Sequence, residues 1–168
     1  MREMKKTTAG WMAVAAAFAS AGSLAAHHSL SQFDTTTAVS VKGAIVRVEL
    51  VNPHTILFLD HKGEGGQTQR WAVEGPGVTQ LTRMGIHKEA FKVGDVIEAC
   101  GYVTKEPVEI QRTASEPFSL SIKPATPNSV STRLMDAELL VMPDGQKQKW
   151  SDYGQHKCLG PDYHDFHK

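Results

Sequence analysis

Three features that often reveal what a protein does are absent from this sequence: a strong net charge, a familiar catalytic motif and, beyond the first residues, a long apolar run. The chain carries 18 lysines and arginines against 18 aspartates and glutamates, which argues against a basic surface for nucleic acid or anionic lipid. No Gly-x-Ser-x-Gly elbow, His-Glu-x-x-His pair or phosphate-binding Gly-x-x-x-x-Gly-Lys loop occurs. Because no second apolar stretch reaches about 18 residues, we expect no transmembrane segment in the mature chain. A binding or accessory protein is therefore favoured over an enzyme.

Cysteine is also scarce. The chain has two cysteines, Cys100 and Cys158, and no Cys-x-x-Cys or Cys-x-x-Cys-His motif. A thioredoxin-like redox pair and a c-type haem attachment site are thereby excluded. An even number of cysteines in an exported chain predicts one disulfide bond.

Residues 1–25 have the pattern of a secretory signal peptide. A basic start precedes an uncharged apolar run at residues 9–21, which is too short to cross a membrane. Small residues at positions 23 and 25 favour cleavage after Ala25, and cleavage after Ala26 is the alternative. No twin arginine precedes the run and no cysteine follows it, so we expect Sec export to the bacterial periplasm or beyond, without a lipid anchor. The mature chain would keep 15 basic and 17 acidic residues, a net charge of about −2.

Beyond the signal peptide the hydrophobic pattern is that of β-strands with one helical interlude. In residues 39–51 the apolar positions are odd as far as Ile45 and even from Val46, as a bulge or sharp bend just after Gly43 would produce in one long strand. The Asn-Pro-His turn at 52–54 follows, and residues 56–59 and 69–74 predict two further strands. The helical material lies in residues 78–91, in two short pieces divided by Gly85.

The second half predicts two more strands, at residues 96–103 and 130–142. The stretch between them holds four prolines and no sustained period, which indicates a long loop with at most a short strand at 118–122. This order predicts a mostly β protein, a five-stranded OB-like barrel with a short helix between strands 3 and 4. An immunoglobulin-like sandwich is the alternative, but it would need about seven strands. We expect the barrel domain to span residues 26–148 and a polar, histidine-rich tail to span 149–168.

Four short motifs carry a resemblance to a known family. They are Ala26-His27-His28-Ser29, Asn52-Pro53-His54, Trp71-Ala72-Val73-Glu74-Gly75, and Lys92-Val93-Gly94-Asp95 followed by Cys100-Gly101. In this order, over about residues 26–145, they resemble a family of small exported bacterial proteins of unknown function whose mature chains typically begin Ala-His-His-Ser. The resemblance implies that His27, His28 and His54 matter, and it implies no particular reaction. The chain departs from the family pattern between Tyr102 and Val130, where it is longer, and from Lys149 onward.

Cleavage after Ala25 would create a copper site at the new N-terminus. A terminal amine, the amides that follow it and a histidine in third position form the square-planar nitrogen set that copper(II) or nickel(II) prefers. The sequence Ala26-His27-His28 meets this requirement. Cleavage after Ala26 would instead place His27 first, where its amine and ring chelate copper, with His54 as a third nitrogen. The alternative is that His27 and His28 are solvated and that His54 only bonds backbone in its turn.

The remaining candidate groups are weaker. The spacing of His156, Cys158, His164 and His167 can hold zinc or copper(I), but a solvated tail with a disulfide explains it more simply. His61 and His87 are expected at the surface. Glu74 and Asp95 could act as acid and base, although carboxylates at strand ends and turns are usually solvated.

The leading hypothesis is therefore an exported, non-catalytic binding or accessory protein that handles copper in the periplasm through its N-terminus. One alternative is a metal-free module that docks a small molecule or a periplasmic or membrane-associated protein. Another is a copper-dependent redox enzyme built on the same histidines. No nucleic-acid partner is expected.

We predict that the exported protein starts at Ala26 or, failing that, at His27, because signal peptidase requires small residues before the cut. The intact mass of the protein from the periplasmic fraction measures this directly. A protein that retains Met1 would contradict both the export and the N-terminal copper site.

Overall fold

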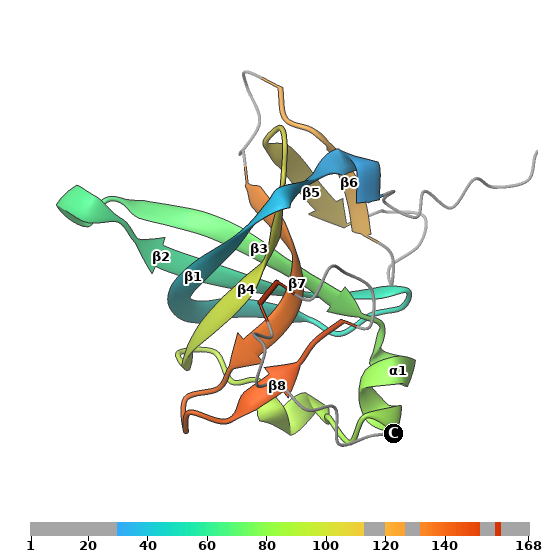
Figure 1. Ribbon diagram of the computed structural model, residues 1–168. Helices are drawn as coiled ribbons and strands as arrows, with labels where there is room; N and C mark the ends of the chain where they lie inside the picture. Colours follow the sequence, from blue (N-terminus) through green and yellow to red (C-terminus); the bar gives the residue numbers. More distant parts are fainter. Residues whose placement is uncertain (1–29, 113–119, 127–131, 152–156, 159–168) are drawn as a thin grey trace, which may run out of the picture.

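The computed structural model describes residues 30–112, 120–126, 132–151 and 157–158. As predicted, the protein is mostly β (Figure 1). Its strands are β1 (Phe33–Glu49), β2 (His54–Lys62), β3 (Thr68–Pro76), β4 (Val96–Thr104), β5 (Val108–Arg112), β6 (Leu120–Pro124), β7 (Arg133–Val141) and β8 (Lys147–Lys149). One α-helix, α1 (Val78–Arg83), and three 3-10 turns, η1 (Leu30–Gln32), η2 (Glu64–Gly66) and η3 (Lys88–Ala90), complete the described elements. None of the described helices is long and apolar enough to cross a membrane.

Five of the strands form a closed circuit of hydrogen bonds. The main sheet has the order β3-β2-β1-β4-β7-β8, and β3 also pairs with β7, so the circuit returns to its start. The closing pair is parallel and runs from Trp71 opposite Arg133 to Glu74 opposite Asp136. As predicted, the helix lies between the third and fourth of these strands in the chain. Figure 1 shows α1 and β8 at one end of the strands, and the β5–β6 hairpin at the other end.

Strand β1 serves two neighbours. It pairs with β4 from Phe33 to Ala44 and with β2 from Ala44 to Glu49. The predicted irregularity occurs between Ile45 and Arg47, where the register with β2 shifts. At Gly43 a Cβ atom would lie 2.8 Å from the carbonyl oxygen of Asp60, so only glycine allows β2 to approach this closely. One long strand thus turns from one side of the circuit to the other.

The strands bury side chains on both faces, which explains the continuous apolar run in β2. Because successive side chains point to opposite faces, Leu57 and Leu59 join one cluster, and Ile56 and Phe58 join another. The first cluster also collects α1 through Leu81, and Trp150. The second lies under the β5–β6 hairpin and contains Phe33, Ile56, Phe58, Ala72, Tyr102, Val108 and Leu134.

The described part has eight strands, so the predicted count of five was wrong. Strands β5 and β6 pair from Val108 opposite Pro124 to Arg112 opposite Leu120, where a loop with one short strand was expected. Pro107 and Pro124 stand at the ends of this hairpin, where a missing N–H is tolerated but interrupts the pattern. Ile110 and Ile122 pack on the second cluster, and only this non-local contact reveals their role.

The structured domain also continues beyond the expected boundary at residue 148. Lys149 pairs with Leu139, and the side chain of Trp150 is fully buried. The Trp150 ring meets Phe91 edge-on, with 5.3 Å between ring centroids. One tryptophan among polar residues has no periodicity, so the sequence pattern could not place it. His156, His164 and His167 lie outside the described residues.

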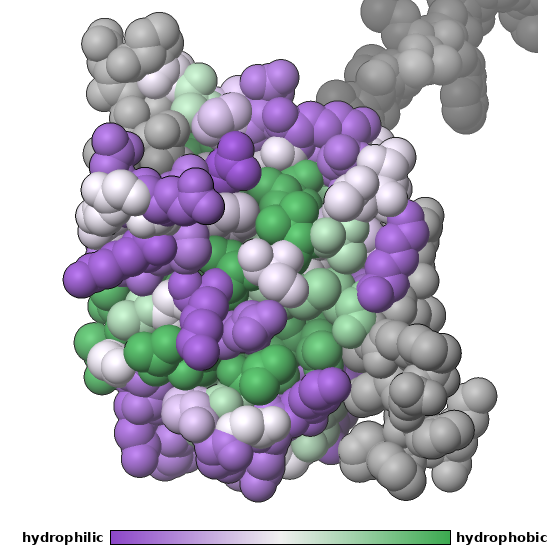
Figure 2. Space-filling view, turned by 60° about the vertical axis from the view of Figure 1, so that its left-hand side comes forward, coloured by the Kyte–Doolittle hydropathy of each residue, from purple (hydrophilic) through white to green (hydrophobic). Residues whose placement is uncertain are grey.

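The surface is mixed. On the face that Figure 2 shows, hydrophobic side chains occupy the middle and hydrophilic ones surround them. The exposed large hydrophobic residues of the described part are Val93 and Val96, at 69% and 47% exposure, on either side of the turn that enters β4. Isolated exposed valines of this kind are ordinary and indicate no site by themselves.

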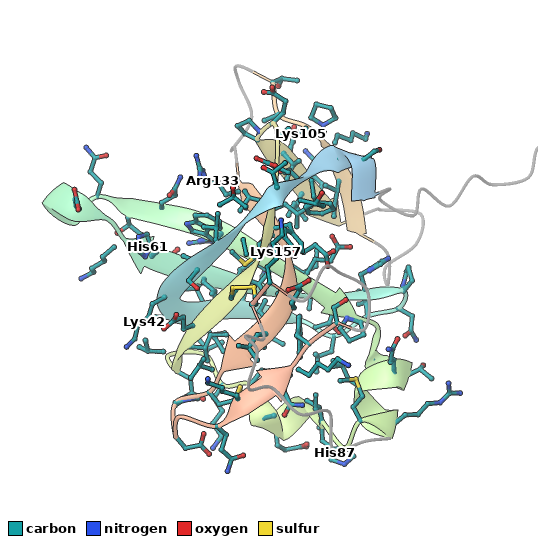
Figure 3. The ribbon with its side chains drawn as sticks, viewed as in Figure 1. Lys42, His61, His87, Lys105, Arg133 and Lys157 are labelled. Atoms are coloured by element: carbon teal, nitrogen blue, oxygen red, sulfur yellow. A yellow bond between two sulfur atoms is a disulfide. The ribbon has the colours of Figure 1, made fainter. Side chains whose placement is uncertain are left out.

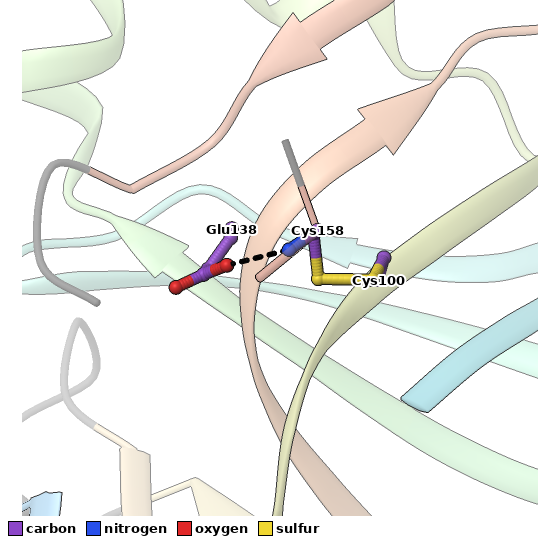
Figure 4. The surroundings of a disulfide bond; sticks show 3 residues. All are labelled: Cys100, Glu138 and Cys158. Carbon is purple, nitrogen blue, oxygen red and sulfur yellow. Dashed lines mark hydrogen bonds between the residues drawn. A yellow bond between two sulfur atoms is a disulfide. The ribbon is translucent and has the colours of Figure 1, made fainter. Parts of the chain in front are cut away.

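The predicted disulfide is confirmed. Cys100 of β4 is bonded to Cys158 across a sequence separation of 58 residues. The backbone N–H of Cys158 also donates to Oε2 of Glu138 at 3.1 Å, as Figure 4 shows. Cys158 is thereby attached to both β4 and β7.

We predict that Cys158→Ser lowers the free energy of unfolding by up to about 4 kcal/mol, since the disulfide closes a long loop in the unfolded chain. Urea denaturation measures the loss, with Cys100→Ser and the double variant as controls. The double variant should lose no more than either single one. Two free thiols in unfolded, unreduced wild-type protein would contradict the disulfide.

Candidate functional site

The Asn-Pro-His turn is held against the start of α1. Nδ2 of Asn52 donates to the Thr79 hydroxyl at 3.2 Å, and the Thr79 N–H donates to Oδ1 of Asn52 at 3.3 Å. The Asn52–Pro53 peptide is cis. At Gly77 a Cβ atom would lie 2.5 Å from the Pro53 carbonyl oxygen, so a glycine is required there. These contacts fix the position of the turn, and therefore the position of His54, the first residue of β2.

The structure brings His54 and Glu74 together, which the sequence did not indicate. Nδ1 of His54 lies 3.1 Å from Oε1 of Glu74. The two side chains come from neighbouring strands, because β2 and β3 are antiparallel with Ile56 opposite Glu74. The His54 side chain is 37% exposed and the Glu74 side chain only 5%. One member of the pair therefore lies near the surface and the other in the interior.

Glu74 begins a row of three acidic side chains. It stands opposite Asp136 in the parallel β3–β7 pair, and Glu138 lies two residues further along β7. Burial, followed by the nearby Asp136, raises the pKa of Glu74 to about 8. Burial, followed by Glu138, raises the pKa of Asp136 to about 6. The raised pKa favours the neutral form of Glu74 near pH 7, and its 3.1 Å approach to His54 is a close polar contact.

Trp150 bonds to the backbone of the two strands that carry this row. Its indole Nε1 donates to the Glu74 carbonyl oxygen at 3.1 Å, and its backbone N–H donates to the Glu138 carbonyl oxygen at 2.8 Å. A Cβ atom at Gly75 would lie 1.9 Å from Nε1 of Trp150. The glycine that follows Glu74 is thus needed to admit the tryptophan.

A metal site is not formed within the described residues. No group of three or more histidine, cysteine, aspartate or glutamate side chains there could hold a metal ion. His27 and His28 precede the described part of the chain, so the structure does not place them beside His54. Nδ1 of His61 lies 2.8 Å from the Lys42 carbonyl oxygen, and His87 is exposed.

Sequence analysis missed Asp136 and Glu138. Along β7 they alternate with Met135, Ala137 and Leu139, a pattern that assigns acidic residues to solvent. Glu138 is instead only 1% exposed, and its carboxylate accepts from the backbone N–H of the disulfide-bonded Cys158. Asp95, the other carboxylate considered, lies in a turn where its carbonyl oxygen accepts from the Ile45 N–H at 2.8 Å.

Comparison with known proteins assigns the chain to a family. The chain belongs to the family described as "Family of unknown function (DUF6152)", whose sequence profile matches residues 14–110. This confirms kinship with a family of unknown function, and the match ends before β7, Trp150 and Cys158. No curated protein matches the chain.

A crystal structure of a mitochondrial single-stranded DNA binding protein from S. cerevisiae is similar to 68% of this chain and to 96% of its own. The sequence identity is 10% and the TM-score is 0.38. A likeness this distant carries no argument about fold or function.

We predict that Glu74→Gln flattens the pH dependence of stability. The raised pKa means that the folded protein binds more protons than the unfolded chain between about pH 4.5 and 8, so wild-type stability falls as pH rises through that window. Over this window the variant should lose less stability than the wild type. The two slopes should differ by at most about 1.4 kcal/mol per pH unit, the value for one proton. Urea denaturation at several pH values measures this, with the exposed Glu106→Gln as control. Parallel profiles for wild type and Glu74→Gln would contradict the assignment.

Proposed function

We propose that this protein is exported to the periplasm and binds copper(II) at the N-terminus of its mature chain, without catalysing a reaction. The observation that carries the proposal is the sequence Ala26-His27-His28 directly after the signal-peptide pattern. It provides an amine, two amides and an imidazole in the order that a square-planar copper site requires. The family assignment names no competing activity.

The position of the motif supports a surface copper site close to the fold. The chain is anchored soon after His28, because Nζ of Lys105 donates to the Ser31 carbonyl oxygen at 3.0 Å and the Lys105 N–H donates to the Gln32 carbonyl oxygen at 3.0 Å. Phe33 is then buried at the start of β1. A copper ion at the terminus would be held within a few residues of the folded domain and open to exchange with a partner protein.

His54 is the third nitrogen if the mature chain starts at His27. Its contact with Glu74 resembles the carboxylate contacts that usually orient metal-ligating histidines. Because Nδ1 faces Glu74, copper would have to be bound through Nε2, which is buried here, so the His54 ring would have to turn outward to bind the ion. In the form that starts at Ala26 the N-terminal residues provide all four nitrogens, and His54 is not needed.

We further propose that the closed circuit of strands is an OB-type barrel. The support is the parallel β3–β7 closure, the bend in β1 and the position of α1 between β3 and β4. On this view the β5–β6 hairpin is an insertion before the last barrel strand. It lies in the segment where the chain is longer than the family pattern.

The copper proposal predicts about one equivalent of copper(II) on the mature protein, with a visible d-d band and nitrogen hyperfine structure in electron paramagnetic resonance. An additional N-terminal methionine shifts the histidines out of position, so binding should weaken at least about ten-fold, as it should in His28→Ala. Affinity should also fall as pH drops, because imidazole and amide nitrogens must lose protons to bind.

His61→Ala is the matched control and should bind copper like the wild type. His54→Ala should weaken binding only in protein that starts at His27. If the methionine-extended protein binds copper as tightly as the mature form, the N-terminal site is wrong.

A further inference from the structure

A large bulge in β1 opens a cavity beside β4. Asp34 stands opposite Val103 and Val39 opposite Gly101, so five residue steps in β1 oppose two in β4. The bulge is held by specific bonds: the amide and hydroxyl of Thr36 donate to Oδ1 of Asp34 at 3.0 and 2.5 Å. A stabilised bulge of this kind usually redirects side chains for a purpose.

Lys157, next to the disulfide, also secures the bulge. Its Nζ donates to the carbonyl oxygens of Thr35 and Thr36 at 2.8 and 2.7 Å. The bulge is therefore hydrogen-bonded to Lys157 in addition to its pairing with β4. Its shape does not depend on a bound ligand.

The cavity has a volume of about 330 Å³, which suits a small molecule. Valine side chains from β1 and β4 give it an apolar wall. The hydroxyl of Thr104 is buried and has no hydrogen-bond partner among the described residues. The lining residues are Asp34, Thr37, Val39, Val103, Thr104, Lys105, Pro107 and Arg133.

Charges of both signs line this cavity. Lys105 and Arg133 are the cations and Asp34 is the anion, and among the described residues Asp34 makes no ion pair with either. Hydrogen bonds from Thr36, and after them the nearby Lys105 and Lys157, lower the pKa of Asp34 below its usual value. Figure 3 shows Lys105 and Arg133 beside the N-terminal half of β1, well away from Lys42 and His87.

The side chain of Arg133 lies against the Trp71 ring. Its guanidinium carbon lies 5.4 Å from the centre of the Trp71 ring, and Trp71 is buried at the start of the β3–β7 pair. A cation–π contact of this kind favours one position of the guanidinium group, whose paired N–H donors match a carboxylate. The arginine is thus prepared for a bidentate contact with a ligand.

We propose that this cavity binds a small zwitterion that carries a carboxylate and an ammonium group, such as an amino acid or a short ω-amino acid. The ligand carboxylate bonds to Arg133 and Lys105, and its ammonium group bonds to Asp34. A simple anion would contact the two cations but leave Asp34 without a ligand partner, and a simple cation would be repelled by the two basic residues. The site uses none of the atoms of the proposed copper site.

Titration of ¹⁵N-labelled protein, followed by NMR, tests the proposal. The probes are glycine, β-alanine, 4-aminobutyrate and 6-aminohexanoate, which differ in charge separation, with acetate, methylammonium and inorganic phosphate for comparison. At least one zwitterion should bind at least about ten-fold more tightly than any singly charged probe or phosphate, and should shift the amide signals of Thr37, Val103 and Thr104.

Asp34→Asn should weaken that zwitterion at least about ten-fold and leave acetate binding equal or stronger, because only the ammonium contact is lost. Arg133→Gln, or Lys105→Met if the first variant fails to fold, should weaken zwitterion and acetate alike. Lys42→Met is the matched control and should bind like the wild type.

The proposal is overturned if no zwitterion of the series shifts the cavity signals, or if acetate or phosphate binds as tightly as the best zwitterion. It is also overturned if folded Asp34→Asn binds the zwitterion like the wild type.

Discussion

The parallel pairing of β3 with β7 is the contact on which the rest of the structure depends, because it alone closes the circuit of strands. Trp150, which follows β7 and β8 in the chain, stabilises this pairing. Its indole donates to the Glu74 carbonyl oxygen on β3, and its backbone N–H donates to the Glu138 carbonyl oxygen on β7. The contact is possible only because residue 75 is a glycine. A residue near the end of the chain thus stabilises two strands that are far apart in sequence, and the disulfide at Cys158 then keeps that end in place.

The same closure explains the unusual carboxyl groups. When β3 and β7 align, Glu74 and Asp136 become direct neighbours, and both are removed from water. Two adjacent buried negative charges would be costly, so protonation accompanies closure. His54, whose Nδ1 lies 3.1 Å from Oε1 of Glu74, places a partly exposed side chain beside this buried carboxyl group. Proton uptake is therefore a consequence of the topology and would occur whether or not the site also has a function.

Much of the fold could be predicted because its evidence is local. The parity switch near Gly43 anticipated that β1 serves two partners, Gly85 divides the helical segment, and the two cysteines form the expected disulfide. The features that escaped prediction all depend on contacts between distant residues. Trp150 has no apolar neighbours in sequence to mark it as core, and Asp136 occupies a position that is normally solvated. The proposed copper motif is the opposite case: it is visible in the sequence, but it lies outside the residues that the structure describes.

Lys105 connects the proposed zwitterion cavity to the segment just before β1. Lys105 lines the zwitterion cavity, and its ammonium group also donates to the carbonyl oxygen of Ser31, three residues after His28. An ammonium group has three N–H donors, so it can bond to a ligand carboxylate without releasing Ser31. A bound zwitterion would then order Lys105 further and hold the segment that follows the copper motif more firmly. Because the copper ligands lie upstream and the cavity groups downstream of this anchor, either site can be absent without removing the other.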